Sequence, residues 1–167
     1  DTHFGDLERR DLATGEARYI SPQPVIEFGA GAGSSPYRFN WSAPLLISPH
    51  DPNRLYYGSD VLFTSTDEGA TWRAMSPDLS QPCDKAWVAE SGGPITHDNT
   101  NAEAYCTIYA IAEDASGART MWAGTDDGNL EITRDGGKSW TNVANNISGL
   151  PPHSWVASID ATHEWGG

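Results

Sequence analysis

Three ionisable side chains lie close together in one long polar stretch of the chain, residues 81–104. His97 and Asp98 are neighbours, and Glu103 follows five residues later. An imidazole beside carboxylates can transfer protons in general acid–base catalysis, and the same groups can bind a metal ion. The spacing matches no established metal-ligand pattern. A solvated polar loop is therefore the competing interpretation, and we predict no metal site.

The same stretch holds two candidates for binding a ligand. Trp87 carries a large flat ring, which can stack on an apolar surface such as a sugar face. The side chain of Asn99 can both donate and accept hydrogen bonds. We therefore predict that a ligand-binding role in this stretch would fall to Trp87 and Asn99.

The elements that would position these residues are indicated by an octapeptide that occurs twice. Residues 65–72 read Ser-Thr-Asp-Glu-Gly-Ala-Thr-Trp, and residues 133–140 read Thr-Arg-Asp-Gly-Gly-Lys-Ser-Trp, 68 positions later. Both fit the pattern [Ser/Thr]-x-Asp-x-Gly-x-[Ser/Thr]-Trp. Internal repetition at a fixed period indicates a fold built from copies of one unit.

The repeated octapeptide fits a tight turn between two β-strands. Its Asp can accept hydrogen bonds from nearby backbone N–H groups, and its Gly suits a backbone with positive φ. The Ser and Thr side chains can add hydrogen bonds to the backbone, while the Trp ring packs beneath the turn. We predict structural roles for Ser65, Asp67, Gly69, Thr71, Trp72, Thr133, Asp135, Gly137, Ser139 and Trp140.

Short apolar runs surround both octapeptides in the same order. They cover residues 44–48, 54–58, 61–64 and 73–76 in the first unit, and 107–112, 120–124, 129–132 and 141–144 in the second. Runs of this length between Gly, Pro, Asp and Asn are typical of β-strands. Four strands per unit predict an all-β fold, a β-propeller segment of four-stranded antiparallel blades. The first strand of each blade would be innermost and buried on both faces.

The repeat also divides the chain. We predict two full blades plus partial blades at both ends, and an arc of this kind leaves apolar faces and strand edges unpaired. We therefore expect the remaining propeller blades or other protein subunits as partners. The divisions are the end of a preceding blade (6–22), a connector (23–40), the first blade (41–80), the long loop (81–104), the second blade (105–148) and the start of a following blade (149–167).

The octapeptides resemble Asp-boxes, the turns of sialidases, sortilin-type receptors and bacterial BNR-repeat proteins. Other parts of the chain resemble a subgroup of large secreted bacterial propellers, which are sortilin-like and often labelled glycosyl hydrolases. The matching words lie at residues 10–16, 38–41, 47–52, 76–79, 98–100 and 122–128. The resemblance implies an extracellular or periplasmic location. It also implies that Asp67 and Asp135 are turn residues on the outer side of the blades.

The family label raises the question of catalysis. A glycoside hydrolase normally carries two carboxylates that face one sugar bond, and the sequence does not show which of its carboxylates would pair. Sialidases also need a cluster of arginines and a Tyr nucleophile. Only ten Lys and Arg residues occur in the whole chain, without such a cluster, so sialidase activity is not predicted.

Composition excludes two classes of partner. The formal net charge of −13 argues against nucleic acid and against an anionic membrane surface. No apolar run approaches the roughly 18 residues of a membrane span.

Cys83 and Cys106 allow either a disulfide in an oxidising compartment or a buried Cys106 that acts as a small hydrophobe. No cofactor is predicted.

Three functions fit these observations. The first is a non-catalytic propeller module, a secreted scaffold that binds a protein or glycan partner. The second is a fragment of a glycoside hydrolase, with catalytic groups shared between this chain and other blades. The third is an accessory subunit of a multi-chain complex. Loss of activity on changing His97, Asp98 or Glu103 to Ala would place a catalytic site in the long loop.

Overall fold

The computed structural model of the chain describes residues 5–23, 35–83, 95 and 104–161. In this part of the chain the regular elements are β-strands, apart from short 3-10 turns such as η3 (Ala144–Asn146). The prediction of an all-β fold is confirmed. Within the same residues, no helix has the length and hydrophobicity that a membrane crossing requires.

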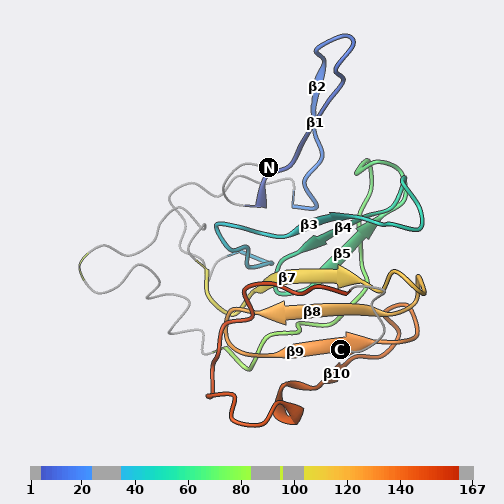
Figure 1. Cartoon of the computed structure of the whole chain (residues 1–167). Coiled ribbons are helices and arrows are strands. Elements are labelled where there is room, and N and C mark those ends of the chain that lie inside the picture. The colour runs from blue at the N-terminus through green and yellow to red at the C-terminus, as the bar shows by residue number, and fades with distance from the viewer. Residues whose placement is uncertain (1–4, 24–34, 84–94, 96–103, 162–167) are drawn as a thin grey trace.

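Two four-stranded antiparallel sheets follow each other along the chain, and in each the strands are ordered as in the sequence. Figure 1 shows them as neighbouring layers. The first contains β3 (Leu45–Ile47), β4 (Leu55–Gly58), β5 (Leu62–Ser65) and β6 (Arg73–Ala74). The second contains β7 (Ile108–Glu113), β8 (Met121–Thr125), β9 (Leu130–Thr133) and β10 (Thr141–Asn142). Repeated sheets of this kind are propeller blades, as predicted.

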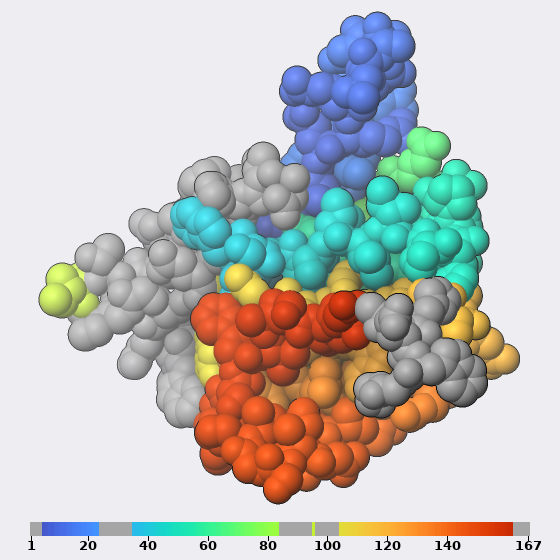
Figure 2. All heavy atoms as spheres, viewed as in Figure 1, coloured from blue at the N-terminus to red at the C-terminus, as the bar shows by residue number. Residues whose placement is uncertain are grey.

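A separate hairpin precedes the two sheets. Its strands β1 (Glu8–Arg10) and β2 (Ala17–Tyr19) pair antiparallel, and the tip of the hairpin projects away from the two sheets (Figures 1 and 2). The carboxylate of Asp11 closes the turn by accepting hydrogen bonds from the backbone N–H groups of Ala13 and Thr14, at 2.8 and 2.9 Å. The sequence predicted the end of a preceding blade in this region, at residues 6–22.

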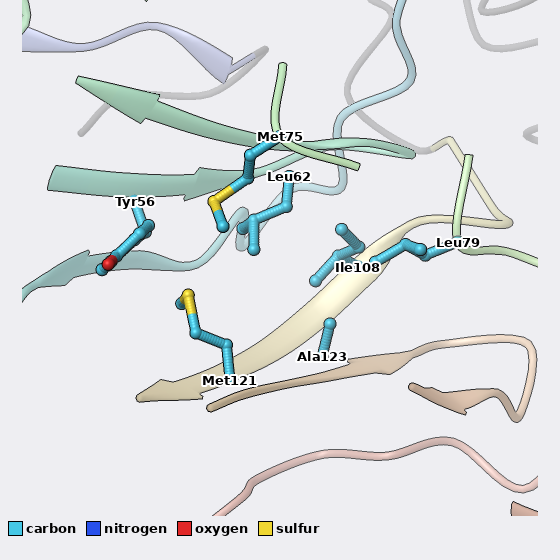
Figure 3. Close-up of a cluster of buried hydrophobic side chains, with 7 residues drawn as sticks. All are labelled: Tyr56, Leu62, Met75, Leu79, Ile108, Met121 and Ala123. Atoms are coloured by element: carbon cyan, nitrogen blue, oxygen red, sulfur yellow. The ribbon is translucent and has the colours of Figure 1, made fainter. Parts of the chain in front are cut away.

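The two sheets pack face to face through a cluster of apolar side chains (Figure 3). A buried Leu, Ile or Met side chain contributes about 2 kcal/mol to stability, so this cluster fixes how the blades stack. The first blade supplies Tyr56, Leu62, Met75 and Leu79, and the second supplies Ile108, Met121 and Ala123.

One prediction about the innermost strands is wrong. Residues of β7 are buried or half-buried, but Leu45 and Ile47 of β3 are 46% and 59% exposed. On this face of the first sheet, Leu7 and Ile20 pack near Phe63, which belongs to the third strand. The same cluster contains Tyr57 of β4, the second strand, but no residue of β3. Within the described residues, the inner strand β3 has no neighbouring sheet against that face.

The two octapeptides form turns with the same internal hydrogen bonds. The backbone N–H and the hydroxyl of Thr71 both donate to the carboxylate of Asp67, at 2.9 and 2.6 Å. The backbone N–H of Gly69 donates to the hydroxyl of Ser65 at 2.9 Å. The same three contacts recur, at 2.9, 2.6 and 2.9 Å, among Ser139, Asp135, Gly137 and Thr133.

Each turn is attached to the unit that precedes it. The indole N–H of Trp72 donates to the carbonyl of Ile20 at 2.5 Å, and that of Trp140 donates to the carbonyl of Met75 at 3.4 Å. Ile20 directly follows β2 and Met75 directly follows β6, so the two acceptors hold equivalent places. The repeat in the sequence is therefore a repeat in three dimensions.

Candidate functional site

Polar side chains gather at one end of the two sheets, which we call the loop end. It comprises the β4–β5 turn (59–61), the β8–β9 turn (126–129) and the segment that enters β7 (104–107), and it lies on the left in Figure 1. Cys83 and Cys106 form a disulfide here. The sequence left this pairing open. The bond holds together the two ends of the predicted long loop.

Arg38 connects three parts of the loop end. Its guanidinium pairs with Asp60 at 3.2 Å and with Asp78 at 2.6 Å, and its Nε donates to the carbonyl of Cys106 at 3.2 Å. Burial raises the pKa of Asp60, and the positive charge of Arg38 opposes that rise. Asp60 therefore acts as the counter-charge of a buried ion pair.

The β8–β9 turn carries two buried carboxylates. Asp126 accepts hydrogen bonds from the backbone N–H and hydroxyl of Thr107, at 2.9 and 2.8 Å, and from the side chain of Asn40 at 3.0 Å. Asp127 is 1% exposed and accepts from the backbone N–H of Gln81 at 2.9 Å. Burial raises the pKa of Asp126, while its donors favour the ionised form. These contacts join the turn to three other segments.

These contacts decide what the carboxylates can do. Glycoside hydrolysis needs an acid and a base that face a common sugar bond. Asp60, Asp126 and Asp127 instead face donors of the protein itself. Among the described residues, no group of three or more His, Cys, Asp or Glu side chains is placed to hold a metal ion. The three carboxylates hold the loop end together.

An open pocket of about 520 Å³ lies at the loop end. Side-chain amides supply much of its polar lining, from Gln81, Asn129, Asn142 and Asn145. The side chain of Asn142 donates to that of Asn129 at 2.7 Å, and Asn129 donates to the carbonyl of Leu79 at 2.8 Å, which orients both amides. An amide can donate and accept at once, so this pocket suits a ligand rich in hydroxyl groups.

His153 borders the same pocket in a strained backbone conformation. Its φ is 59°, in the left-handed region that L residues rarely occupy. Its ring Nδ1 lies 3.3 Å from the carbonyl oxygen of Asp127. A Cβ on Gly128 would lie 2.8 Å from the Cα of His153, so the close approach requires glycine there. Strain of this kind beside a pocket is an indication of a functional site.

The residues that the sequence predicted for catalysis and ligand binding all lie outside the described residues. They are His97, Asp98 and Glu103 for catalysis, and Trp87 and Asn99 for ligand binding. Sequence reasoning missed Arg38, Asn145 and His153. One feature of the sequence could have pointed to the loop end. Asp60 and Asp126 occupy equivalent turns in the two units, and each lies two residues after a glycine of the second strand.

No known family model matches the chain. It is 27% identical to a xyloglucanase from Paenibacillus sp over 123 residues, which is 71% of this chain and 12% of that protein. It is 28% identical to xyloglucanase Xgh74A of Acetivibrio thermocellus over 137 residues, which is 79% of this chain and 16% of that protein. The chain thus spans a small fraction of the curated relatives it matches.

Solved structures give a matching fold. A GH74 enzyme from Niastella koreensis aligns with 95% of this chain and 21% of its own, with a TM-score of 0.55 and 16% sequence identity. The narrower grouping with sortilin-like BNR-repeat proteins stays a prediction. Fold and sequence together relate the chain to glycosyl hydrolases of the propeller type.

Proposed function

We propose that this chain is a segment of a glycoside hydrolase of the propeller type, and that it contributes a contact surface for a xyloglucan-like polysaccharide. The observation that carries the proposal is the similarity to two xyloglucanases over 71% and 79% of the chain. Those relatives are matched over only 12% and 16% of their length, so the activity and substrate of the whole protein belong to the proposal.

The amide-lined pocket is the proposed contact surface. Sugars present many hydroxyl groups, and each amide can hydrogen-bond to two of them. Three of the amides, those of Gln81, Asn129 and Asn142, are held by hydrogen bonds to the protein, which lowers the entropic cost of ordering them around a ligand. Asp60, Asp126 and Asp127 are engaged in holding the loop end. We therefore assign the acid and base to residues outside the described part, with Asp98 and Glu103 as the candidates.

A second candidate function has its own support. Asp60, Asp126 and Asp127 all accept hydrogen bonds from the protein, which favours a non-catalytic module that binds glycan without cleaving it. A secreted or periplasmic location suits both candidates. The Cys83–Cys106 disulfide supports that location, since such bonds persist in oxidising compartments.

Affinity electrophoresis in gels that contain xyloglucan tests the proposal. We expect the chain to be retarded, and we expect Asn145→Ala to weaken binding about fivefold, the effect of one lost hydrogen bond. Asn53→Ala is the matched control, since Asn53 is an exposed amide in the β3–β4 turn, at the other end of the sheet. Equal mobility with and without xyloglucan would contradict the proposal.

Release of reducing sugar separates the two candidates. Cleavage that is lost in Asp98→Ala or Glu103→Ala, with binding retained, supports a catalytic role for the long loop. Binding without cleavage by the chain and by any longer protein that contains it supports the non-catalytic module.

A further inference from the structure

His153 holds a strained backbone conformation that neither the repeated turn nor the disulfide explains. Among the described residues other than glycine, positive φ occurs at Glu68, Cys106 and His153, at 57°, 65° and 59°. Glu68 stands where the second octapeptide has Gly136, and Cys106 is bonded to Cys83. His153 is under neither constraint. Strain of this kind is kept in proteins where it serves a function.

The surrounding chain holds His153 in this conformation. Pro151 and Pro152 precede it, and each proline ring fixes the φ of its own residue. The hydroxyl of Ser154 donates to the carbonyl of Pro151 at 2.7 Å. On the other side, Gly128 lies so close that a Cβ there would meet the Cα of His153 at 2.8 Å. The imidazole therefore leaves a fixed backbone at the border of the amide-lined pocket.

One carbonyl oxygen orients side chains from two walls of this pocket. The carbonyl oxygen of Asp127 lies 3.3 Å from Nδ1 of His153, and it accepts a hydrogen bond from the side-chain amide of Gln81 at 2.6 Å. A carbonyl oxygen can only accept, so Nδ1 of His153 carries a hydrogen. In the neutral ring this tautomer leaves Nε2 as an acceptor.

A ligand rich in hydroxyl groups needs such an acceptor. Each hydroxyl hydrogen that loses water on binding must find a new acceptor, or the complex is weakened. Two amide oxygens of the pocket already serve protein donors: Oδ1 of Asn129 accepts from Asn142 at 2.7 Å, and Oδ1 of Asn142 accepts from the backbone N–H of Ala144 at 2.9 Å. His153 is exposed, so its Nε2 can be reached by a ligand.

His153 is also the titratable residue among those that line the pocket. The described elements around it carry other titratable or charged groups, but these do not line the pocket: Arg38, Asp78, Tyr105, Asp126, Asp127 and Asp160. Imidazole side chains change charge between pH 5 and pH 8. A change in ligand binding over that range therefore reports on the ring of His153.

We infer that His153 is a ligand-binding residue of the amide-lined pocket, whose neutral ring accepts a hydrogen bond from a sugar hydroxyl through Nε2. This role rests on the proposed function, because it takes a polysaccharide as the ligand. It adds that the carbonyl of Asp127 selects the binding tautomer. It also makes binding dependent on pH, because protonation of the ring removes the acceptor.

Two variants separate the two ring nitrogens. His153→Asn places an amide near the position of Nδ1 and has no atom at Nε2, and Asn tolerates the left-handed backbone. We expect it to keep the Tm of the wild type and to bind xyloglucan oligosaccharides about fivefold more weakly at pH 8, measured by calorimetry. His153→Gln carries an amide that reaches toward the position of Nε2 and does not titrate, so its affinity at pH 8 should lie within about twofold of the wild type.

The pH profile distinguishes a ligand contact from a structural role. Between pH 8 and pH 5.5 we expect the affinity of the wild type to fall about fivefold, as the imidazole becomes protonated. His153→Gln should show a flat profile. His50→Asn is the matched control, since His50 is an exposed imidazole in the β3–β4 turn, at the other end of the sheet, and its loss should leave the wild-type profile unchanged.

Nuclear magnetic resonance of the ring nitrogens tests the tautomer without any ligand. At pH 8 the signals that disappear in His153→Asn belong to His153, and they should show the hydrogen on Nδ1. A hydrogen on Nε2 would overturn the inference, because that atom would then be a donor.

The binding results have distinct consequences. If Asn145→Ala weakens binding while His153→Asn binds as the wild type does, the inference is wrong and the proposed function stands. If the wild type binds no xyloglucan, both are wrong. If His153→Asn lowers the Tm, His153→Gln decides: a pH profile that slopes as steeply as that of the wild type would overturn the inference.

Discussion

Single carboxylates close the two turns that repeat in this chain. The hydroxyl of Thr71 and neighbouring donors lower the pKa of Asp67 to about 2, and the hydroxyl of Ser139 is the first of the donors that lower the pKa of Asp135. Asp67 is exposed and Asp135 is half-buried, and in both the local hydrogen bonds are the first causes of the pKa shift.

The pH dependence of stability in the variant Asp67→Asn tests whether the local hydrogen bonds lower the pKa of Asp67. A carboxylate whose pKa is lower in the folded state adds stability above its unfolded pKa of about 3.8, and that stability is lost as the pH falls toward 2. We expect the Tm of the wild type to exceed that of Asp67→Asn at pH 7, with the gap closing between pH 4 and pH 2. Asp135→Asn should behave alike. A gap that stays constant across this range would contradict the assignment.

Arg38→Met tests the ion pair at the loop end. The side chains of Arg38 and Asp60 are 17% and 8% exposed, so removal of the cation leaves a buried charge uncompensated. We expect a loss of about 3 kcal/mol in the free energy of unfolding, measured by denaturant titration at pH 7. Arg18→Met is the control, since Arg18 and Glu16 are 66% and 63% exposed and their pair contributes under about 1 kcal/mol. Equal losses in the two variants would refute the buried-pair interpretation.

At the scale of elements, the strands were predictable because their signals are local. The run expected at residues 107–112 is β7 at Ile108–Glu113, and the run expected at 73–76 contains β6 at Arg73–Ala74. The exposure of β3 was not predictable. Apolar residues such as Leu45 indicate that a face can be buried, but they do not show whether a neighbouring sheet is present to bury it.

The loop end was less predictable than the strands, because its contacts join residues far apart in the sequence. Asn40 and Asp126 are 86 positions apart, and Arg38 and Cys106 are 68 apart. Neither pair has a periodic pattern that a single sequence would reveal. The burial of the carboxylates in the β8–β9 turn depends on these distant donors.

The two neighbouring tyrosines of β4 give a matched test of how the sheets are joined. The hydroxyl of Tyr56 donates to the buried carboxylate of Glu113 at 2.8 Å, across the interface between the blades. The hydroxyl of Tyr57 has no hydrogen-bond partner within the described part of the chain. Tyr56→Phe should lower the free energy of unfolding by about 2 kcal/mol, because the buried carboxyl group of Glu113 loses a hydrogen-bond donor.

Tyr57→Phe is the control for that change. It removes an unsatisfied buried hydroxyl, so we expect stability that is unchanged or slightly higher. Denaturant titration of both variants supplies the comparison. If Tyr57→Phe proved the more costly of the two, the contact between Tyr56 and Glu113 would not be the one that matters.

At the scale of the whole molecule, the disulfide closes the stretch of chain that connects the two blades at the loop end. Cys83 and Cys106 are 23 positions apart, and closing a loop of that length contributes about 3 kcal/mol in the chain-entropy model. Reduction should lower the free energy of unfolding by that amount. The double variant Cys83→Ser/Cys106→Ser should match the reduced protein and ignore added reductant. Full reduction, shown by thiol titration, with an unchanged Tm would contradict this prediction.

The two tryptophan turns give the stack of blades a direction. Trp72 binds backward to Ile20, and Trp140 binds backward to Met75. Trimming the protein from its first hairpin would strip Trp72 of its acceptor, while trimming it from residue 161 inward to the end of β10 would leave both indole N–H groups paired. Local unfolding should therefore spread more readily from the N-terminal hairpin than from the C-terminal end of the described chain, because each tryptophan turn depends on the unit that precedes it.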